Sequence, residues 1–217
     1  MLAIFKREFK SYFQNVIGWL FVAALLAVYG LYFYVYNLKN GYPYISYDLK
    51  GIGFIMMIAV PILTMRSLSD EKKTKTDQLM LTSPVSVGRI VAGKYLAMAA
   101  VYTIDIALFA LSPLVLSIYG KVALSEAYVA LFGYWLYGLS CIAVGLFISS
   151  ISESVIISAI LTFAALFLSY MMQSITGLIS SSGNLLTKVL NCFDLYTPFE
   201  NFVSGCFSVT SAAYYVT

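Results

Sequence analysis

The sequence contains no histidine. A Ser/His/Asp triad and a histidine-ligated metal site are therefore excluded. Charged residues are also scarce, at 11% of the 217 residues, against roughly 25% in soluble domains. The three cysteines, Cys141, Cys192 and Cys206, match no zinc-binding spacing. We therefore expect no metal and no cofactor on this chain, and an integral membrane enzyme is the weakest of the function classes.

Apolar side chains dominate instead. They make up 61% of the chain, and the mean hydropathy is +0.87. A folded surface in water needs more polar residues than this sequence supplies, so the solvent for most of the chain is a lipid bilayer. We predict an all-α, polytopic membrane protein with a single transmembrane domain over residues 1–217.

Five stretches approach or reach the roughly 20 apolar residues that a spanning helix needs. Pro61 breaks the second stretch, and Pro113 lies near the far end of the third. Residues 175–211 form an extracytoplasmic segment with short amphipathic or re-entrant helices. We expect residues 212–217 to be the start of a sixth span, truncated in this sequence. The five predicted spans are residues 16–36, 51–68, 90–119, 126–150 and 154–173.

The N-terminal residues 1–15 carry Leu2, Phe5, Phe9, Tyr12 and Phe13 at helical spacing. An aromatic stripe opposite a basic face is typical of a helix that lies in the membrane interface. The alternative is a frayed basic tail, which the aromatic stripe disfavours.

Lysine and arginine set the expected orientation. With a cytoplasmic N-terminus, nine of the thirteen basic residues fall in inner segments and four in outer ones. This bias favours an inside N-terminus. The inner residues are Lys6, Arg7, Lys10, Arg66, Lys72, Lys73, Lys75, Arg89 and Lys94, and the outer ones are Lys39, Lys50, Lys121 and Lys188.

The stretch GRIVAGKY, residues 88–95, is one letter from a phosphate-binding loop. Tyr95 stands where that loop needs Ser or Thr, and a proline turn precedes Gly88 in place of a strand. The apolar residues that follow belong to the third span. We therefore interpret the match as accidental and expect Lys94, about one turn inside the inner boundary, to extend toward the lipid headgroups.

The longest hydrophilic stretch, residues 66–89, separates the second and third spans. Residues 69–82 are expected to form a cytoplasmic helix, with its core at 69–81: Ser69 is a candidate N-cap, Asp70 and Glu71 suit the first turn, and Pro84 stops the helix. A rod of this length is long for a mere connection. It is either a contact for a cytoplasmic partner or a solvated interfacial helix.

The residues EKKTKTDQLMLTSPVSVGRIVAGKYLA resemble the cytoplasmic segment of ABC-2 type transporter permeases. The predicted spans, the basic amphipathic N-terminus and the stretch DLYTPFENFVSG extend the resemblance over nearly the whole chain. Within the family, the sequence is most similar to the gliding-motility-type and nitrous-oxide-maturation-type permeases. The matching positions are Glu71, Lys72, Thr76, Leu79, Leu81, Pro84, Val85, Gly93 and Lys94.

Three positions depart from the family pattern. Lys75 stands where the family usually has glycine, Gln78 where a glutamate is common, and Met80 where a leucine is common. The loss of that glutamate puts in doubt any salt bridge that it makes to a partner. The truncated sixth span is a further departure.

The resemblance implies a six-helix, type V exporter-like transmembrane domain and a separate ABC ATPase subunit that binds ATP and Mg²⁺. Residues 69–81 would then be a coupling helix that carries motion from the ATPase into the membrane. Leu79, Met80 and Leu81 would enter an apolar groove of the ATPase, and neighbouring charges would steer the contact. The candidate coupling residues are Asp70, Glu71, Lys72, Lys73, Thr76, Asp77, Gln78, Leu79, Met80, Leu81 and Glu153.

Some assignments stay open. Glu153, between the fourth and fifth spans, is either a second coupling element or a carboxylate placed against a helix dipole. Asp105, deep in the third span, either lines a substrate path or subunit contact or is satisfied by a neighbour such as Tyr102, Thr103 or a basic residue on another helix. Cys192 and Cys206 either pair in an oxidising exterior or remain thiols.

The leading hypothesis is the permease subunit of an ATP-driven transporter, exporting a substrate or transmitting force, in the inner membrane of a prokaryote. It would act as a homodimer or as a heterodimer with a related permease, and no nucleic acid partner is expected. The alternative is a secondary transporter or channel subunit that uses Asp105.

Overall fold

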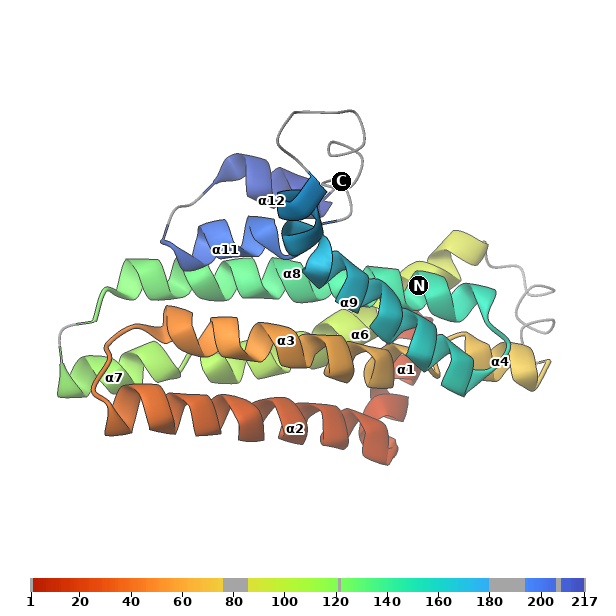
Figure 1. Cartoon of the computed structure of the whole chain (residues 1–217). Helices are drawn as coiled ribbons and strands as arrows, with labels where there is room; N and C mark the ends of the chain where they lie inside the picture. The colour runs from red at the N-terminus through yellow and green to blue at the C-terminus, as the bar shows by residue number, and fades with distance from the viewer. Residues whose placement is uncertain (1, 76–85, 121, 180–193, 206–207, 217) are drawn as a thin grey trace.

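Figure 1 shows the computed structural model, which describes residues 2–75, 86–120, 122–179, 194–205 and 208–216. All regular structure within these ranges is helical, so the predicted all-α class is confirmed. The long helices are α2 (Val16–Phe33), α3 (Ile45–Thr64), α6 (Val87–Phe109), α8 (Leu124–Ile151) and α9 (Val155–Ile179). The shorter elements are α1 (Leu2–Gln14), the π-helix η1 (Tyr34–Lys39), α4 (Ser69–Lys73), α7 (Ser112–Tyr119), α11 (Thr197–Val203) and α12 (Val209–Val216).

Five stretches of the described chain are long and apolar enough to cross a membrane. They extend over Val16–Lys39, Ile45–Lys73, Val87–Tyr119, Leu124–Ile151 and Val155–Met172. The helices α2, α3, α6 and α8 run side by side, and α9 crosses the bundle obliquely (Figure 1). The chain is thus a multi-pass membrane protein.

Proline acts differently in two of these stretches. Pro61 was expected to break the second span, but α3 continues through it to Thr64, where the side-chain hydroxyl donates to the carbonyl of Val60 at 3.0 Å. Pro113 was expected near the end of one long helix over residues 90–119, but the structure has two helices there. Helix α6 ends at Phe109 and α7 begins at Ser112, because proline lacks the N–H that a continuous helix would need.

Helix α8 lies at the centre of the packing, in contact with α3, α6, α9, α11 and α12. Glycines on α8 allow its neighbours to come close. A Cβ atom on Gly145 would lie only 2.5 Å from the Oγ1 of Thr64 on α3. Any larger residue at position 145 would therefore push α3 and α8 apart.

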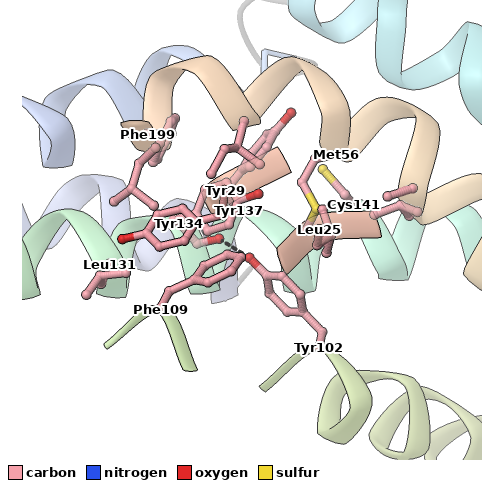
Figure 2. Close-up of a cluster of buried hydrophobic side chains, with 14 of the residues drawn as sticks. Leu25, Tyr29, Met56, Tyr102, Phe109, Leu131, Tyr134, Tyr137, Cys141 and Phe199 are labelled. Carbon is pink, nitrogen blue, oxygen red and sulfur yellow. Dashed lines mark hydrogen bonds between the residues drawn. The ribbon is translucent and has the colours of Figure 1, made fainter. Parts of the chain in front are cut away.

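Part of the core of the bundle is aromatic (Figure 2). Tyr29 stacks on Phe109 with ring centroids 4.1 Å apart, and Tyr137 stacks on Phe199 at 5.5 Å. Phe199 belongs to α11, which begins three residues after Asp194. The carboxylate of Asp194 accepts the backbone N–H groups of Tyr196 and Thr197, both at 3.0 Å, and so fixes the start of this short helix.

Candidate functional site

Four parts of the chain meet at one end of the bundle, which we call the α4 end. They are α1, α4, the beginning of α6 and the end of α8 (Figure 1). Four candidate coupling residues lie on α4, namely Asp70, Glu71, Lys72 and Lys73. The α4 end is where these charged residues gather, so we build the site from there.

Lys94 is the centre of this site. It lies in the second turn of α6, and its side chain is only 2% exposed. Its ammonium group donates to the carboxylate of Glu71 at 2.7 Å and to the backbone carbonyl of Ser67 at 2.8 Å. The carboxylate of Glu8 on α1 lies 3.5 Å away. The expectation that Lys94 extends to the lipid headgroups is wrong, because the two carboxylates hold it inside the protein.

Arg7 completes an ion cluster of four charges. Its guanidinium lies 2.8 Å from a carboxylate oxygen of Glu8 and 3.9 Å from one of Glu71. The cluster of Arg7, Glu8, Glu71 and Lys94 has two positive and two negative charges, so it is neutral as a whole. A neutral, mutually paired cluster is the form in which charges can be held near an apolar bundle.

The same carboxylates affect Tyr12 of α1, whose hydroxyl donates to the carbonyl of Leu63 at 3.3 Å. Burial raises the pKa of Tyr12 well above its usual value, and the nearby charges of Glu8 and Glu71 raise it further. Tyr12 therefore stays neutral and adds a second link between α1 and the α3–α4 region.

Helix α4 is also fastened to the end of α8. The hydroxyls of Ser69 and Ser149 lie 2.9 Å apart, and the Ser149 hydroxyl accepts the backbone N–H groups of Leu68 and Ser69, both at 3.2 Å. The ammonium of Lys72 donates to the carbonyl of Ser150. Ser69, predicted as an N-cap, is thus buried against α8. Helix α4 is therefore bonded to α8 through Ser69 and Lys72 and to α6 through Glu71.

The coupling helix predicted over residues 69–81 is not one continuous helix. Helix α4 ends at Lys73, and Lys75 has a φ of +56°, in the left-handed region. This conformation stops a helix and is one that glycine adopts with least strain. It explains in physical terms why a glycine at this position suits the family pattern that Lys75 departs from.

A Lys75→Gly variant is therefore expected to be more stable, by about 1 kcal/mol, because a side chain in the left-handed region costs roughly 1–2 kcal/mol. The free energy of unfolding of the purified chain in detergent measures this. Lys73→Gly is the matched control: position 73 is helical, where glycine costs up to about 1 kcal/mol relative to alanine. Equal effects of the two substitutions would contradict the left-handed assignment.

The remaining candidate residues are placed as follows. Asp70 and Lys73 are exposed on α4, whereas Glu71 is engaged inside the cluster. Glu153 is exposed in the turn between α8 and α9, at the α4 end. Thr76, Asp77, Gln78, Leu79, Met80 and Leu81 lie outside the described residues, as do Cys192 and Cys206.

A polar cavity of about 340 Å³ opens beside the cluster. Its walls include Arg7, Tyr12, Arg66, Asp70 and Glu71. Arg66 and Asp70 are exposed at its rim. The α4 end therefore has a cavity with charged residues at its rim, and the ion cluster of paired charges lies beside it.

Asp105 lies apart from this site, in the second-last turn of α6 and near the middle of the apolar stretch Val87–Tyr119, and is completely buried. Within the described part of the chain, neither of its carboxyl oxygens has a hydrogen-bond partner. The two neighbours expected to satisfy it bind elsewhere. Tyr102 donates to the carbonyl of Tyr134 at 2.6 Å (Figure 2), and Thr103 donates to the carbonyl of Ala99 at 2.7 Å. Asp105 is thus a buried carboxyl group that no other described residue satisfies.

The near-match to a phosphate loop lies within α6. Residues 88–95 are helical, so their backbone N–H groups point along the helix and do not surround a phosphate. Tyr95 donates its hydroxyl to the carbonyl of Leu139 at 3.3 Å and packs α6 on α8. Lys94 and its partners therefore connect helices at the α4 end, and residues 88–95 do not form a phosphate-binding loop.

Sequence reasoning missed Lys94, Glu8 and Ser149. For Lys94 a signal was present, because a lysine inside an apolar span normally faces the protein interior and pairs with a carboxylate. For Glu8 and Ser149 we find no such signal, since Glu8 is 86 residues from Lys94 and Ser149 is 80 residues from Ser69 in the chain. Only packing brings them to α4 and α6.

Comparison of the sequence with known protein families gives a match over nearly the whole chain. A family model described as ABC-2 family transporter protein matches residues 10–214. Neither the curated proteins nor the solved structures include a significant match. The matched range includes α4, the cluster residues Glu71 and Lys94, and Asp105.

Proposed function

The chain belongs to the ABC-2 family of transporter proteins, and from this premise we propose that it couples ATP hydrolysis by a partner ABC ATPase to export or to force transmission across the membrane. Membership makes the chain a membrane-spanning permease subunit. ATP and Mg²⁺ would be bound by the ATPase and none by this chain. Within the family, we favour the gliding-motility-type and nitrous-oxide-maturation-type permeases on the sequence resemblance.

One observation carries the coupling proposal. Helix α4 turns the exposed Asp70 and Lys73 outward, and it is fastened on its inner side to α1, α6 and α8. A five-residue helix has no stability of its own, so these fastenings are what give α4 a fixed position. A short rigid element with a charged outer face suits a contact through which a partner applies force.

The orientation follows from charge. All nine basic residues assigned to the inner side are described, and they lie on α1, on α4, in the turns that flank α4, or at the beginning of α6. We therefore place the α4 end and the N-terminus in the cytoplasm of a prokaryotic cell, with the bundle in the inner membrane. One copy would supply half of a translocation path, so the working unit is a homodimer or a heterodimer with a related permease.

The coupling proposal is tested at the tip of the predicted coupling segment. Leu79→Asp combined with Leu81→Asp is expected to reduce co-purification of the ABC ATPase at least about 30-fold, because losing an apolar anchor at an interface costs 2 kcal/mol or more. Quantitative pull-down from membranes measures the effect.

The matched control is Tyr42→Asp combined with Tyr44→Asp. These side chains are exposed at the opposite end of the bundle, at 52% and 49%. The control should insert equally well and retain the ATPase. Unchanged pull-down by the Leu79/Leu81 variant would show that this segment is not the contact.

Asp105 favours a second candidate, a secondary transporter or channel subunit. A buried carboxyl without a partner inside a span is typical of an ion or proton path. Such proteins usually place several ionisable residues at the membrane midplane. Asp105 is the one acidic residue of α6, and the ionisable residues Arg89 and Lys94 of this helix lie toward its beginning at the α4 end. The ATP-driven permease is therefore the better-supported function.

A further inference from the structure

The ammonium group of Lys94 has three N–H donors, and the structure places three acceptors around it. These are the carboxylate of Glu71 at 2.7 Å, the carbonyl of Ser67 at 2.8 Å and the carboxylate of Glu8 at 3.5 Å. The acceptors come from α4, from the connection between α3 and α4, and from α1. At 2% exposure, little water reaches the side chain to replace any of them.

We infer that Lys94 is a positioning residue that binds α4 and α1 to α6, so that a displacement of α4 is passed to both helices. The inference rests on the proposed function, because the partner ATPase supplies the displacement. It also gives Glu71 a different role from the one expected on the sequence. Glu71 acts inside the permease, on Lys94, while Asp70 and Lys73 remain on the outer face.

The energy of the ion cluster favours joint movement of α1, α4 and α6 over separation of α4 from the other two helices. If α4 moved without α1 and α6, Lys94 would lose Glu71 and Ser67 while still buried, and Glu71 would lose its nearest cation. Removing one partner of a buried ion pair leaves an uncompensated charge, which is strongly unfavourable. Arg7 adds to the effect, because it contacts a carboxylate from α1 and one from α4. The cluster therefore holds together as a unit.

Glu8→Gln is the best variant for a test. It removes the charge by which α1 is held to Lys94 but leaves Glu71 and Ser67 in place, so the bundle should still fold. Lys94→Met is the second variant, and it removes the centre of the cluster. Lys6→Gln is the matched control, because Lys6 is exposed on α1 one turn or less from Glu8.

The measurement is the distance between two spin labels, one on α1 and one on α4. The exposed residues Lys10 and Lys73 are replaced by cysteine for labelling. The native cysteines are removed by Cys141→Ala, Cys192→Ser and Cys206→Ser. The chain is studied in lipid nanodiscs, first alone and then with the co-purified ATPase trapped by ADP and vanadate.

In the wild type and in Lys6→Gln, we expect a narrow distance distribution whose mean does not shift on trapping, because α1 and α4 move together. In Glu8→Gln, the distribution should broaden in the chain alone, and the mean should shift on trapping. Lys94→Met should broaden it further. The inference is overturned if Glu8→Gln behaves as the wild type in both conditions, or if the wild-type mean shifts on trapping.

The outcomes separate the two proposals. If no ABC ATPase co-purifies with the wild type, the proposed function fails, and the broadening measured in the chain alone still decides whether the cluster joins α1 to α4. If the ATPase binds and hydrolyses ATP but Glu8→Gln leaves the distances unchanged, the proposed function stands and only the role of Lys94 fails.

Discussion

A Lys94→Met variant is expected to lose about 3 kcal/mol of unfolding free energy, the lower part of the range for breaking a buried ion pair. The physical reason is that Glu8 and Glu71 would be left facing each other without their shared cation. The loss stays at the lower end because these two side chains are 16% and 19% exposed and keep Arg7 nearby. Chemical unfolding of the purified chain in detergent, followed by circular dichroism, measures the change.

Arg89→Met is the control for this variant. Arg89 lies on the same helix and at the same end of the bundle, but it is exposed. Substitutions of exposed residues away from special features usually change stability by less than about 0.5 kcal/mol. Equal losses in the two variants would show that Lys94 contributes no more than an ordinary surface charge, and the ion cluster would lose its structural role.

The second large effect has the opposite sign. An Asp105→Val variant is expected to gain about 1–3 kcal/mol of unfolding free energy, since it removes a buried polar group with no hydrogen-bond partner among the described residues. Asp105 is completely buried within α6. The same unfolding measurement applies.

Ala107→Val is the matched control for Asp105→Val, because residue 107 is exposed on the same helix and reports the small helical cost of valine alone. A gain in stability together with lost turnover in the assembled transporter would mark Asp105 as a functional residue retained against stability. A loss of stability would mean that the carboxyl is satisfied by its surroundings and has a structural role.

The coupling segment shows where sequence reasoning stops. Charge pattern and the position of Pro84 predicted one helix over residues 69–81, and the chain does form a helix from Ser69. The helix nevertheless ends at Lys73, because Lys75 takes a left-handed conformation. Lysine carries no local signal for that conformation. The family pattern has glycine at this position, but only the structure shows the left-handed conformation.

Proline positions show a similar limit. Pro61 and Pro113 both lie in apolar stretches, yet the helix continues through the first and a new helix begins at the second. The difference depends on what surrounds each proline. Ser112 donates to the carbonyl of Phe109 at 2.7 Å and bonds to the hydroxyl of Tyr29 from another helix, which stabilises the break before α7.

The sequence by itself determined that this is an integral membrane protein, that it is helical, and which family it belongs to. These properties depend on composition, apolar run length and short motifs, which are local and additive along the chain. Tertiary structure alone decided that Lys94 is buried with Glu8 and Glu71, that Ser149 fastens α4, and that Asp105 lacks a partner. Each of these facts depends on which residues, distant in the sequence, come within hydrogen-bond distance when the helices pack. The periodicity of one helix does not specify which other helices pack against it.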